Sequence, residues 1–287
     1  MSSNITICGF GYVGTAMSCL CKINDIEYNV CDTQLKTGNF NYFSNIVNAI
    51  QFVEKKHGSH FIFICVPTPS DSFGNCDTSI VESILSQIKL HATLDTYIII
   101  KSTLVPGSCQ NFNKLYPDLN IISFPEFLTE RNSESDIVNA KFALLGVPDN
   151  FDQQKYIQVE NLIESLYNHN PNIDIIKKNY TECELFKYSV NNFLAVKVWY
   201  FNKIYDVTRS LGIDYQNLKP LFELDPRVAG YGTRVPGDHG RGFAGSCLIK
   251  EQRGLIKLLE NLQLDNSVLT AISSENEIMR HNDSENQ

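Results

Sequence analysis

A glycine-rich segment near the start of the sequence has the residue types and the spacing that hold the phosphates of a dinucleotide. Residues 9–14, Gly-Phe-Gly-Tyr-Val-Gly, match the pattern G-x-G-x-x-G between an apolar run at 5–8 and a helix-compatible stretch at 15–20. In such a turn the first glycine allows the tight bend, the second lets the backbone approach the pyrophosphate, and the third lets the helix pack on the strand. The start of the helix then offers N–H groups to the phosphates. The predicted cofactor-binding residues of this turn are Gly9, Gly11, Tyr12, Val13 and Gly14.

An acidic residue follows at the position where such a turn expects one. Asp32 stands eighteen positions after Gly14, directly behind an apolar run at 29–31. A carboxylate there accepts hydrogen bonds from the adenosine ribose and repels a 2′-phosphate, so NAD is favoured over NADP. An incidental glycine turn and a flavin site are the alternatives to this interpretation.

Alternating strands and helices must position this turn. Short apolar runs predict strands, and helical spacing separates them. The predicted strands of the first half are 5–8, 29–31, 61–66, 97–101, 121–123 and 142–145, with helices at 14–22, 46–56 and 78–90. Such alternation is typical of a doubly wound α/β domain whose largely parallel sheet is covered on both faces.

From residue 151 onward the pattern becomes mainly helical. Helices are predicted at 153–167, 181–211, 251–262 and 267–280, with a short strand at 174–176 and a Gly/Pro-rich loop at 228–245. We therefore predict a Rossmann-like NAD-binding domain over residues 1–177. A helical central domain, which contains the loop with Cys247, is predicted over residues 178–287.

Composition excludes several classes of function. The net charge is −8 and no basic run exceeds two residues, which disfavours nucleic acid or an anionic membrane as partner. No apolar run approaches the roughly twenty residues that span a bilayer, and the first residues do not resemble a signal peptide. Nine scattered cysteines without a C-x-x-C pair fit a reducing cytoplasm, and six dispersed histidines give no support for a metal site.

Five further segments, taken in order, resemble the UDP-glucose/GDP-mannose dehydrogenase family. They are Cys65-Val-Pro-Thr-Pro69, Lys101-Ser-Thr-Leu-Val-Pro-Gly107, Pro125-Glu-Phe-Leu-Thr-Glu130, Glu184-Leu-Phe-Lys-Tyr-Ser-Val-Asn191 and Gly242-Phe-Ala-Gly-Ser-Cys247. The resemblance extends from about residue 5 to residue 280. It implies a four-electron oxidation of a nucleotide-sugar 6-hydroxyl to a carboxylate with two NAD. UDP-glucose is the favoured substrate because it is frequent in the family.

The resemblance makes Cys247 the nucleophile of the second oxidation. An aldehyde has no good hydride to give until a thiolate adds to it, and the resulting thiohemiacetal yields a thioester that water cleaves. A helix that begins near Ser246 would favour the thiolate through its dipole. A buried structural cysteine is the alternative interpretation.

The same resemblance assigns the other site residues. Lys187 and Asn191, four apart on one helix face, would stabilise the developing oxyanion and hold a water, and Thr103 would position water near the reacting carbon. Glu126 would act as base in thioester hydrolysis, and Glu251 would hold water or Lys187. The remaining cofactor residues are Val66, Pro67, Thr68, Thr103, Glu130 and Lys250, and the substrate residues are Phe127, Leu128, Arg227 and Gly245.

Plainer interpretations compete with several of these assignments. Lys187 alone would be a solvated surface lysine, and Glu126 and Glu130 could both face solvent. Glu184 is expected to be a structural or surface group. Arg227 resembles the arginine that reaches the substrate of a neighbouring subunit in the family dimer, to which the helix at 181–211 would contribute, but an ordinary loop salt bridge is its competitor.

Four features depart from the family pattern. Ala244 replaces a glycine and demands a negative φ or some strain, Glu251 stands where aspartate is usual, and the loop at 228–241 is longer than usual. Family members also continue into a third domain that grips the nucleotide, and the sequence ends before it. We therefore expect weak substrate binding unless another chain supplies that domain. Two alternatives stay open: a two-electron hydroxyacid or 6-phosphogluconate-type dehydrogenase, and an NAD-binding module with little turnover.

Overall fold

The computed structural model describes residues 3–71 and 73–284. Its contacts divide the chain into two compact units. The first comprises the chain up to Pro69 together with Asp77–Lys187, and the second comprises Ser70–Cys76 and the chain from Tyr188 onward. The division predicted after residue 177 falls within the strand Asp174–Lys178, just before the long helix Tyr180–Ser210, whereas the contacts assign the first two turns of that helix to the first unit.

The first unit is built on an eight-stranded sheet in the order β3-β2-β1-β4-β5-β6-β7-β8. The strands are β1 Ser3–Cys8, β2 Tyr28–Cys31, β3 Asn41–Phe43, β4 Ser59–Ile64, β5 Thr96–Ile100, β6 Asn120–Ser123, β7 Phe142–Gly146 and β8 Asp174–Lys178. All neighbours run parallel except β6 and β7, which meet in one antiparallel pairing of Ser123 with Gly146. The chain leaves β1 toward one edge and returns at β4 toward the other. This arrangement confirms the predicted doubly wound sheet and places its switch point between β1 and β4.

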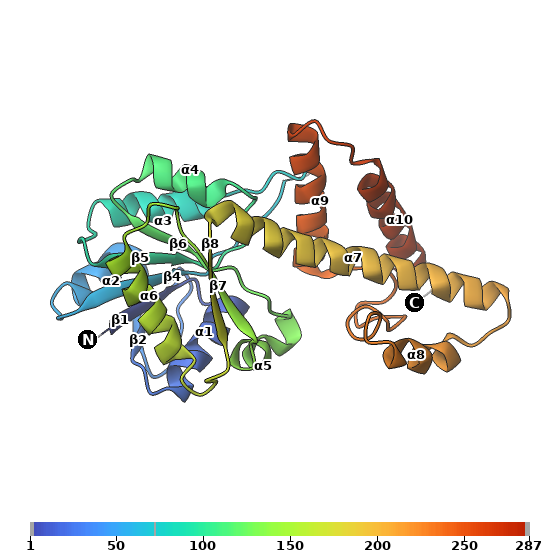
Figure 1. Cartoon of the computed structure of the whole chain (residues 1–287), viewed down its shortest axis with the longest axis horizontal. Helices are drawn as coiled ribbons and strands as arrows, with labels where there is room; N and C mark the ends of the chain where they lie inside the picture. Colours follow the sequence, from blue (N-terminus) through green and yellow to red (C-terminus); the bar gives the residue numbers. More distant parts are fainter. Residues whose placement is uncertain (1–2, 72, 285–287) are drawn as a thin grey trace. The chain divides into compact units, whose positions relative to one another are not determined.

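The strands are apolar throughout because both faces of the sheet are covered. Phe61 and Phe63 of β4 belong to one core, and Ile62 and Ile64 belong to the other. The helices α1 (Tyr12–Ile23), α5 (Ser133–Val138) and α6 (Gln153–Leu166) contribute to the first core, and α2 (Ile46–Val53), α3 (Ser79–Lys89) and α4 (Ser108–Leu115) to the second (Figure 1). Full burial of each such side chain contributes roughly 1.5–3 kcal/mol.

The elements that the sequence did not predict are short. They are β3, α4, α5 and the 3₁₀ turn Glu130–Asn132 in the first unit, and α8 in the second. In α4 only Cys109 and Phe112 are buried, too few for a helical pattern to stand out.

The second unit consists of helices. It contains most of α7 (Tyr180–Ser210), α8 (Tyr215–Leu224), α9 (Gly245–Asn261) and α10 (Ser267–Ser284). One part of α7 packs through Ala195 with Phe243 and Ile272, and a later part packs through Phe201 with Tyr215. The helix α9 begins at Gly245, so the predicted start at residue 251 was wrong, whereas the alternative start near Ser246 agrees with the structure to within one residue. Among the described residues, no helix combines the length and the apolar character needed to cross a membrane.

Candidate active site and cofactor site

The glycine-rich turn joins β1 to α1 and is enforced by close backbone packing. Gly9 has φ +88°, and a Cβ there would lie 2.7 Å from the Cys65 carbonyl oxygen. A Cβ at Gly14 would lie 2.1 Å from the Gly9 carbonyl oxygen. Both positions therefore exclude every side chain, as the predicted turn requires.

Gly11 is constrained differently. It is the N-cap of α1 and has no side chain that could cap the helix, and the first turn of the helix contains no acidic residue. A Cβ at Gly11 would meet nothing within 4 Å, so the protein leaves open space at the start of the helix. A phosphate fits this cradle, because the helix start offers N–H groups and the positive end of the helix dipole.

Asp32 is anchored to the same turn. Its Oδ2 accepts a hydrogen bond from the Phe10 N–H at 2.6 Å, and its Oδ1 accepts one from the Gln34 N–H at 2.8 Å. These bonds hold the carboxylate beside the glycine-rich turn at the end of β2. Each carboxylate oxygen can accept more than one hydrogen bond, so the arrangement remains compatible with ribose hydroxyl donors.

Two segments after neighbouring strands β4 and β5 are bonded to each other. The Thr68 hydroxyl donates to the Thr103 carbonyl at 2.7 Å, and the Ser102 hydroxyl donates to the Val66 carbonyl at 2.7 Å. Thr68 is buried, Val66 and Thr103 are half-buried, and Pro67 is exposed. These predicted cofactor residues thus share the carboxyl edge of the sheet, where doubly wound folds bind ligands.

Glu126 and Lys187 form a buried ion pair in the first unit. The Lys187 Nζ lies 3.0 Å from the Glu126 Oε1, and both side chains are 3% exposed. The Glu126 Oε2 also accepts a hydrogen bond from the Leu128 N–H at 2.6 Å. The surface interpretations of Glu126 and of Lys187 are therefore wrong. A buried charge persists only when it is paired and hydrogen-bonded, and this pair meets that condition.

The residues that follow Glu126 occupy different surroundings. Phe127 is half-buried against Phe142 and Phe186, with ring centroids 5.1 and 5.5 Å away. Leu128 packs against the core of the sheet. Glu130 is exposed and begins a 3₁₀ turn, so solvent is its main neighbour. Their assignments to substrate and cofactor stay predictions.

Glu184, one turn before Lys187 on α7, has a structural role. Its carboxylate accepts hydrogen bonds from the Gly107 N–H at 2.6 Å and the Cys109 N–H at 2.8 Å, and the side chain is buried. It thereby caps the N-terminus of α4. Burial raises the pKa of Glu184 to about 7, although the backbone and side-chain hydrogen bonds at Cys109 oppose the shift.

Cys247 lies in the first turn of α9 and is half-buried. Ala244 before it has φ −139°, an extended conformation, so the alanine in place of glycine causes no strain. The left-handed conformation falls instead on Gly245, which is exposed at φ +82° and would place a Cβ in open space. Tyr231 of the long loop is an electrostatic neighbour. Burial raises its pKa, and Asp238 and Cys247 raise it further.

Two buried asparagines that the sequence did not single out hold the segment before Cys247. The Asn276 Oδ1 accepts from the Phe243 N–H at 2.8 Å, and its Nδ2 donates to the Phe243 carbonyl at 3.0 Å. The Asn202 Oδ1 accepts from the Gly242 N–H at 3.1 Å. Because these partners are more than thirty residues apart in sequence, no local pattern could have revealed them.

The remaining predicted residues of the helical unit differ in exposure. Glu251 is fully buried, and its carbonyl accepts a hydrogen bond from the Asn192 Nδ2 at 3.1 Å. Asn191 is buried and Lys250 half-buried. The Arg227 side chain is 86% exposed and makes a 2.7 Å ion pair with Asp225. In the single chain Arg227 therefore forms an ordinary loop salt bridge, which is the alternative to its assignment as a substrate residue.

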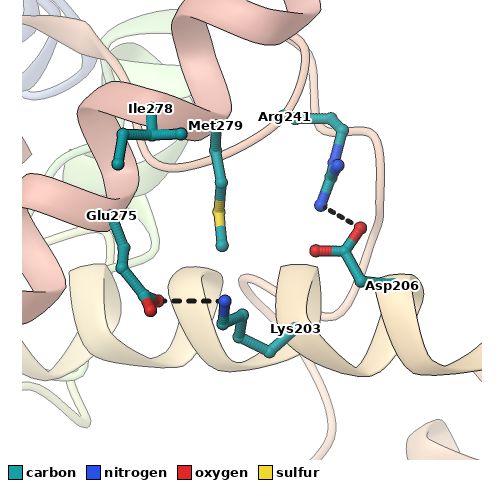
Figure 2. Close-up of a pocket in the computed structure, with 6 residues that line it drawn as sticks. All are labelled: Lys203, Asp206, Arg241, Glu275, Ile278 and Met279. Carbon is teal, nitrogen blue, oxygen red and sulfur yellow. Dashed lines mark ion pairs between the residues drawn. The ribbon is translucent and has the colours of Figure 1, made fainter.

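A pocket in the helical unit contains none of the predicted site residues. Lys203 and Asp206 of α7, Arg241, and three residues of α10 line it, with ion pairs between Lys203 and Glu275 and between Arg241 and Asp206 (Figure 2). Arg241 directly precedes the segment held by the two asparagines. Among the described residues, no group of three acidic, cysteine or histidine side chains is arranged to hold a metal ion.

The sheet, the glycine-rich turn and the acidic residue after β2 define a dinucleotide-binding domain of the dehydrogenase class. Two sequence models of the UDP-glucose/GDP-mannose dehydrogenase family match the chain, the NAD-binding domain over residues 33–170 and the central domain over residues 181–278. The chain therefore belongs to this family. The match to an NAD-binding domain confirms the predicted cofactor.

The curated relatives of the chain agree with this family assignment. The chain is 28% identical over 303 residues to a UDP-glucose 6-dehydrogenase of Rickettsia bellii, covering 95% of the chain and 66% of that protein. It is 31% identical over 229 residues to the Rickettsia prowazekii protein of the same name, covering 77% of the chain and 50% of the relative. The chain thus spans about half to two thirds of the length of these relatives.

Solved structures share the fold. A UDP-glucose dehydrogenase from Pyrobaculum islandicum superposes with a TM-score of 0.77 at 20% identity, covering 97% of this chain and 68% of that one. A 3-hydroxyisobutyrate dehydrogenase from Mycobacterium tuberculosis superposes with a TM-score of 0.72 at 14% identity, covering 96% and 92%. At such identities the likeness establishes the fold alone.

Proposed function

We propose that the protein oxidises the 6-hydroxyl of a nucleotide sugar, with UDP-glucose favoured, to the carboxylate. The observation that carries the proposal is the buried Glu126–Lys187 pair at 3.0 Å. A dehydrogenase needs a fixed positive group that stabilises the negative charge developing on the substrate oxygen. An oxidation that proceeds through a thioester also needs a base that activates water for hydrolysis. The names of the Rickettsia relatives support UDP-glucose as the substrate.

In this proposal residues 1–177 bind NAD, which when bound accepts hydride from the substrate carbon. The glycine-rich turn holds the pyrophosphate, and Asp32 holds the adenosine ribose. Val66, Pro67 and Thr68 flank the cofactor, with Glu130 and Lys250 as further contacts. Phe127, Leu128 and Gly245 contact the substrate.

The first oxidation removes hydride from the sugar carbon and a proton from its hydroxyl, which gives an aldehyde. Lys187 and Asn191 stabilise the negative charge that develops on oxygen, and Thr103 positions a water. Because the Lys187 ammonium is already desolvated and oriented by Glu126, it needs little reorganisation during the step.

The second oxidation starts when the Cys247 thiolate adds to the aldehyde carbon. The thiohemiacetal loses hydride to a second NAD and the proton of its hydroxyl to solvent, and so becomes a thioester. Glu126 then takes a proton from the attacking water, and the thioester breaks to the carboxylate product and the thiol. Glu251 contributes by ordering water in the helical unit, since its position corresponds to the family aspartate.

Product counting tests the proposal. We expect two NADH for each UDP-glucose consumed, and Cys247→Ser should abolish formation of the carboxylate. Cys19→Ser is the matched control, because Cys19 is a half-buried cysteine on α1, outside the proposed machinery. One NADH per substrate, or unchanged carboxylate formation by Cys247→Ser, would contradict the mechanism.

Two other functions give different results in the same assay. A two-electron hydroxyacid dehydrogenase, favoured by the length match to the 3-hydroxyisobutyrate enzyme, would release one NADH and would not need Cys247. An NAD-binding module would bind the cofactor without turning over any nucleotide sugar.

We also propose a homodimer formed through α7. Phe193, Tyr200 and Val207 recur every seven residues and are 63%, 52% and 51% exposed. Side chains seven apart lie on nearly the same face of a helix, so they form an apolar stripe that a second copy would cover, and Arg227 would then reach the partner's substrate. Light scattering should give a dimer for the chain and a monomer for Phe193→Glu/Tyr200→Glu. We further propose a cytoplasmic location, which is supported by nine scattered cysteines without a C-x-x-C pair.

A further inference from the structure

Lys101 is a buried lysine that the proposed reaction does not use. It directly follows β5 and is 2% exposed. Its Nζ lies 3.6 Å from the centroid of the Phe124 ring and 3.4 Å from the Phe124 carbonyl oxygen. A cation over an aromatic face is attracted by the ring, and more strongly when both are desolvated. Lys101 therefore contacts both the side chain and the backbone of Phe124, in the segment that follows β6.

That segment carries Glu126 two residues later. The Glu126 carboxylate itself is held by Lys187 at 3.0 Å and by the Leu128 N–H at 2.6 Å. Burial lowers the pKa of Lys101 to about 8, Cys65 and Glu126 act in the opposite direction, and Lys187 lowers the pKa further. Two buried amines thus influence one carboxylate, and the Cys65 thiol is a further titratable neighbour.

We propose that Lys101 is a positioning residue for Glu126, which it holds in place through Phe124 and to which its own positive charge is electrostatically coupled. The structural half of this inference stands on the contacts alone. The catalytic half rests on the proposed function, in which Glu126 is the base that activates water. Lys187 cannot replace Lys101, because Lys187 bonds to the carboxylate directly and faces the reacting oxygen in the proposed mechanism.

A titration of Lys101 tests the electrostatic coupling without any turnover. The chain is labelled with ¹³C-lysine, and the resonance absent from Lys101→Met is assigned to Lys101. The wild-type midpoint is expected near pH 8. Glu126→Gln should lower the midpoint and Lys187→Met should raise it, each by on the order of half a pH unit or more. The control Lys114→Met, at an exposed residue of α4, should leave it unchanged.

A midpoint that neither Glu126→Gln nor Lys187→Met moves would overturn the proposal, and so would one moved equally by Lys114→Met. If these shifts appear but the wild type oxidises no nucleotide sugar, only the proposed function fails. The two failures are therefore distinguishable.

Kinetics test the catalytic half. Lys101→Met should lower the rate of thioester hydrolysis roughly ten- to hundredfold, the range that follows a displaced catalytic group. The acid limb of its pH profile should move to higher pH, because a positive charge that favours the ionised carboxylate is gone. In Lys101→Arg the acid limb should lie between that of Lys101→Met and that of the wild type. A slower variant with an unshifted limb would show a purely structural lysine and contradict the proposal.

Discussion

The glycine-rich turn before α1 and the cysteine segment, residues 242–247, which leads into the first turn of α9, position a functional group at a helix start in two different ways. Each sets a helix N-terminus beside a place for chemistry, and each contains a glycine in the left-handed conformation, Gly9 at φ +88° and Gly245 at φ +82°. In the sheet unit, backbone atoms pack so closely that no Cβ fits at Gly9. In the helical unit, Gly245 faces open space, and the side chains of Asn202 and Asn276 fix the segment instead. The first turn is thus marked by a local glycine pattern and fixed by backbone packing, against Cys65 as well as within the turn, whereas the second segment is fixed by the side chains of distant residues.

The largest expected effect concerns the sheet unit. Gly14→Ala would place a Cβ 2.1 Å from the Gly9 carbonyl oxygen, so the turn or the helix must shift. We expect NAD affinity, measured by calorimetry, to fall on the order of a hundredfold, with a lower melting temperature. Gly11→Ala is the matched control: its Cβ meets no protein atom, so it should lower NAD affinity and leave the melting temperature unchanged. A stable Gly14→Ala variant with normal affinity would contradict this account of the turn.

The sheet unit should also show a pH dependence of its stability, which arises from the burial of a histidine. His60 of β4 is buried beside the Thr6 hydroxyl at 2.8 Å, and burial lowers its pKa from 6.5 to about 4. Because the folded pKa is depressed, the stability from neutral His60 is fully present above pH 6.5 and is lost as pH falls through about 4. Its full size is about 3 kcal/mol. Urea unfolding of wild type and His60→Gln should show this slope only in the wild type, and equal slopes would refute the assignment.

In the helical unit, the change that corresponds to Gly14→Ala is Asn276→Ala, because it removes the support of the cysteine segment. It removes both hydrogen bonds to Phe243 and leaves buried backbone groups unpaired, at a cost of about 2 kcal/mol in the free energy of unfolding. Because the cysteine segment loses its support, the second hydride transfer should slow while NAD affinity stays normal. Thr270→Ala, at an exposed position of the same helix α10, serves as control. If Asn276→Ala also weakened NAD binding, the claim that the two sites are supported by separate contacts would be contradicted.

The smallest expected effect is at Gly245. Gly245→Ala meets no steric obstacle, so only the left-handed conformation costs free energy, about 1–2 kcal/mol. Thermal unfolding should show a modest decrease. A loss as large as that of Gly14→Ala would mean that backbone packing also determines the second turn.

This contrast explains what the sequence could predict. The apolar strands, the long helix and the turn at residues 9–14 follow from patterns within a few residues of each other, and the structure contains them. The burial of Glu126 and Lys187, the cap that Glu184 gives to α4, and the bonds from Asn202 and Asn276 all join residues far apart in the chain. Residue type alone could not distinguish a surface glutamate from a buried one.

The most direct test of the proposed chemistry is to trap the thioester. The variant Glu126→Gln is mixed with NAD and UDP-glucose, and the masses of the intact protein and of its proteolytic peptides are measured by mass spectrometry. We predict a UDP-glucuronyl adduct on the peptide that contains Cys247, with two NADH formed for each adduct. Two NADH without an adduct, or an adduct on a different cysteine, would contradict the account.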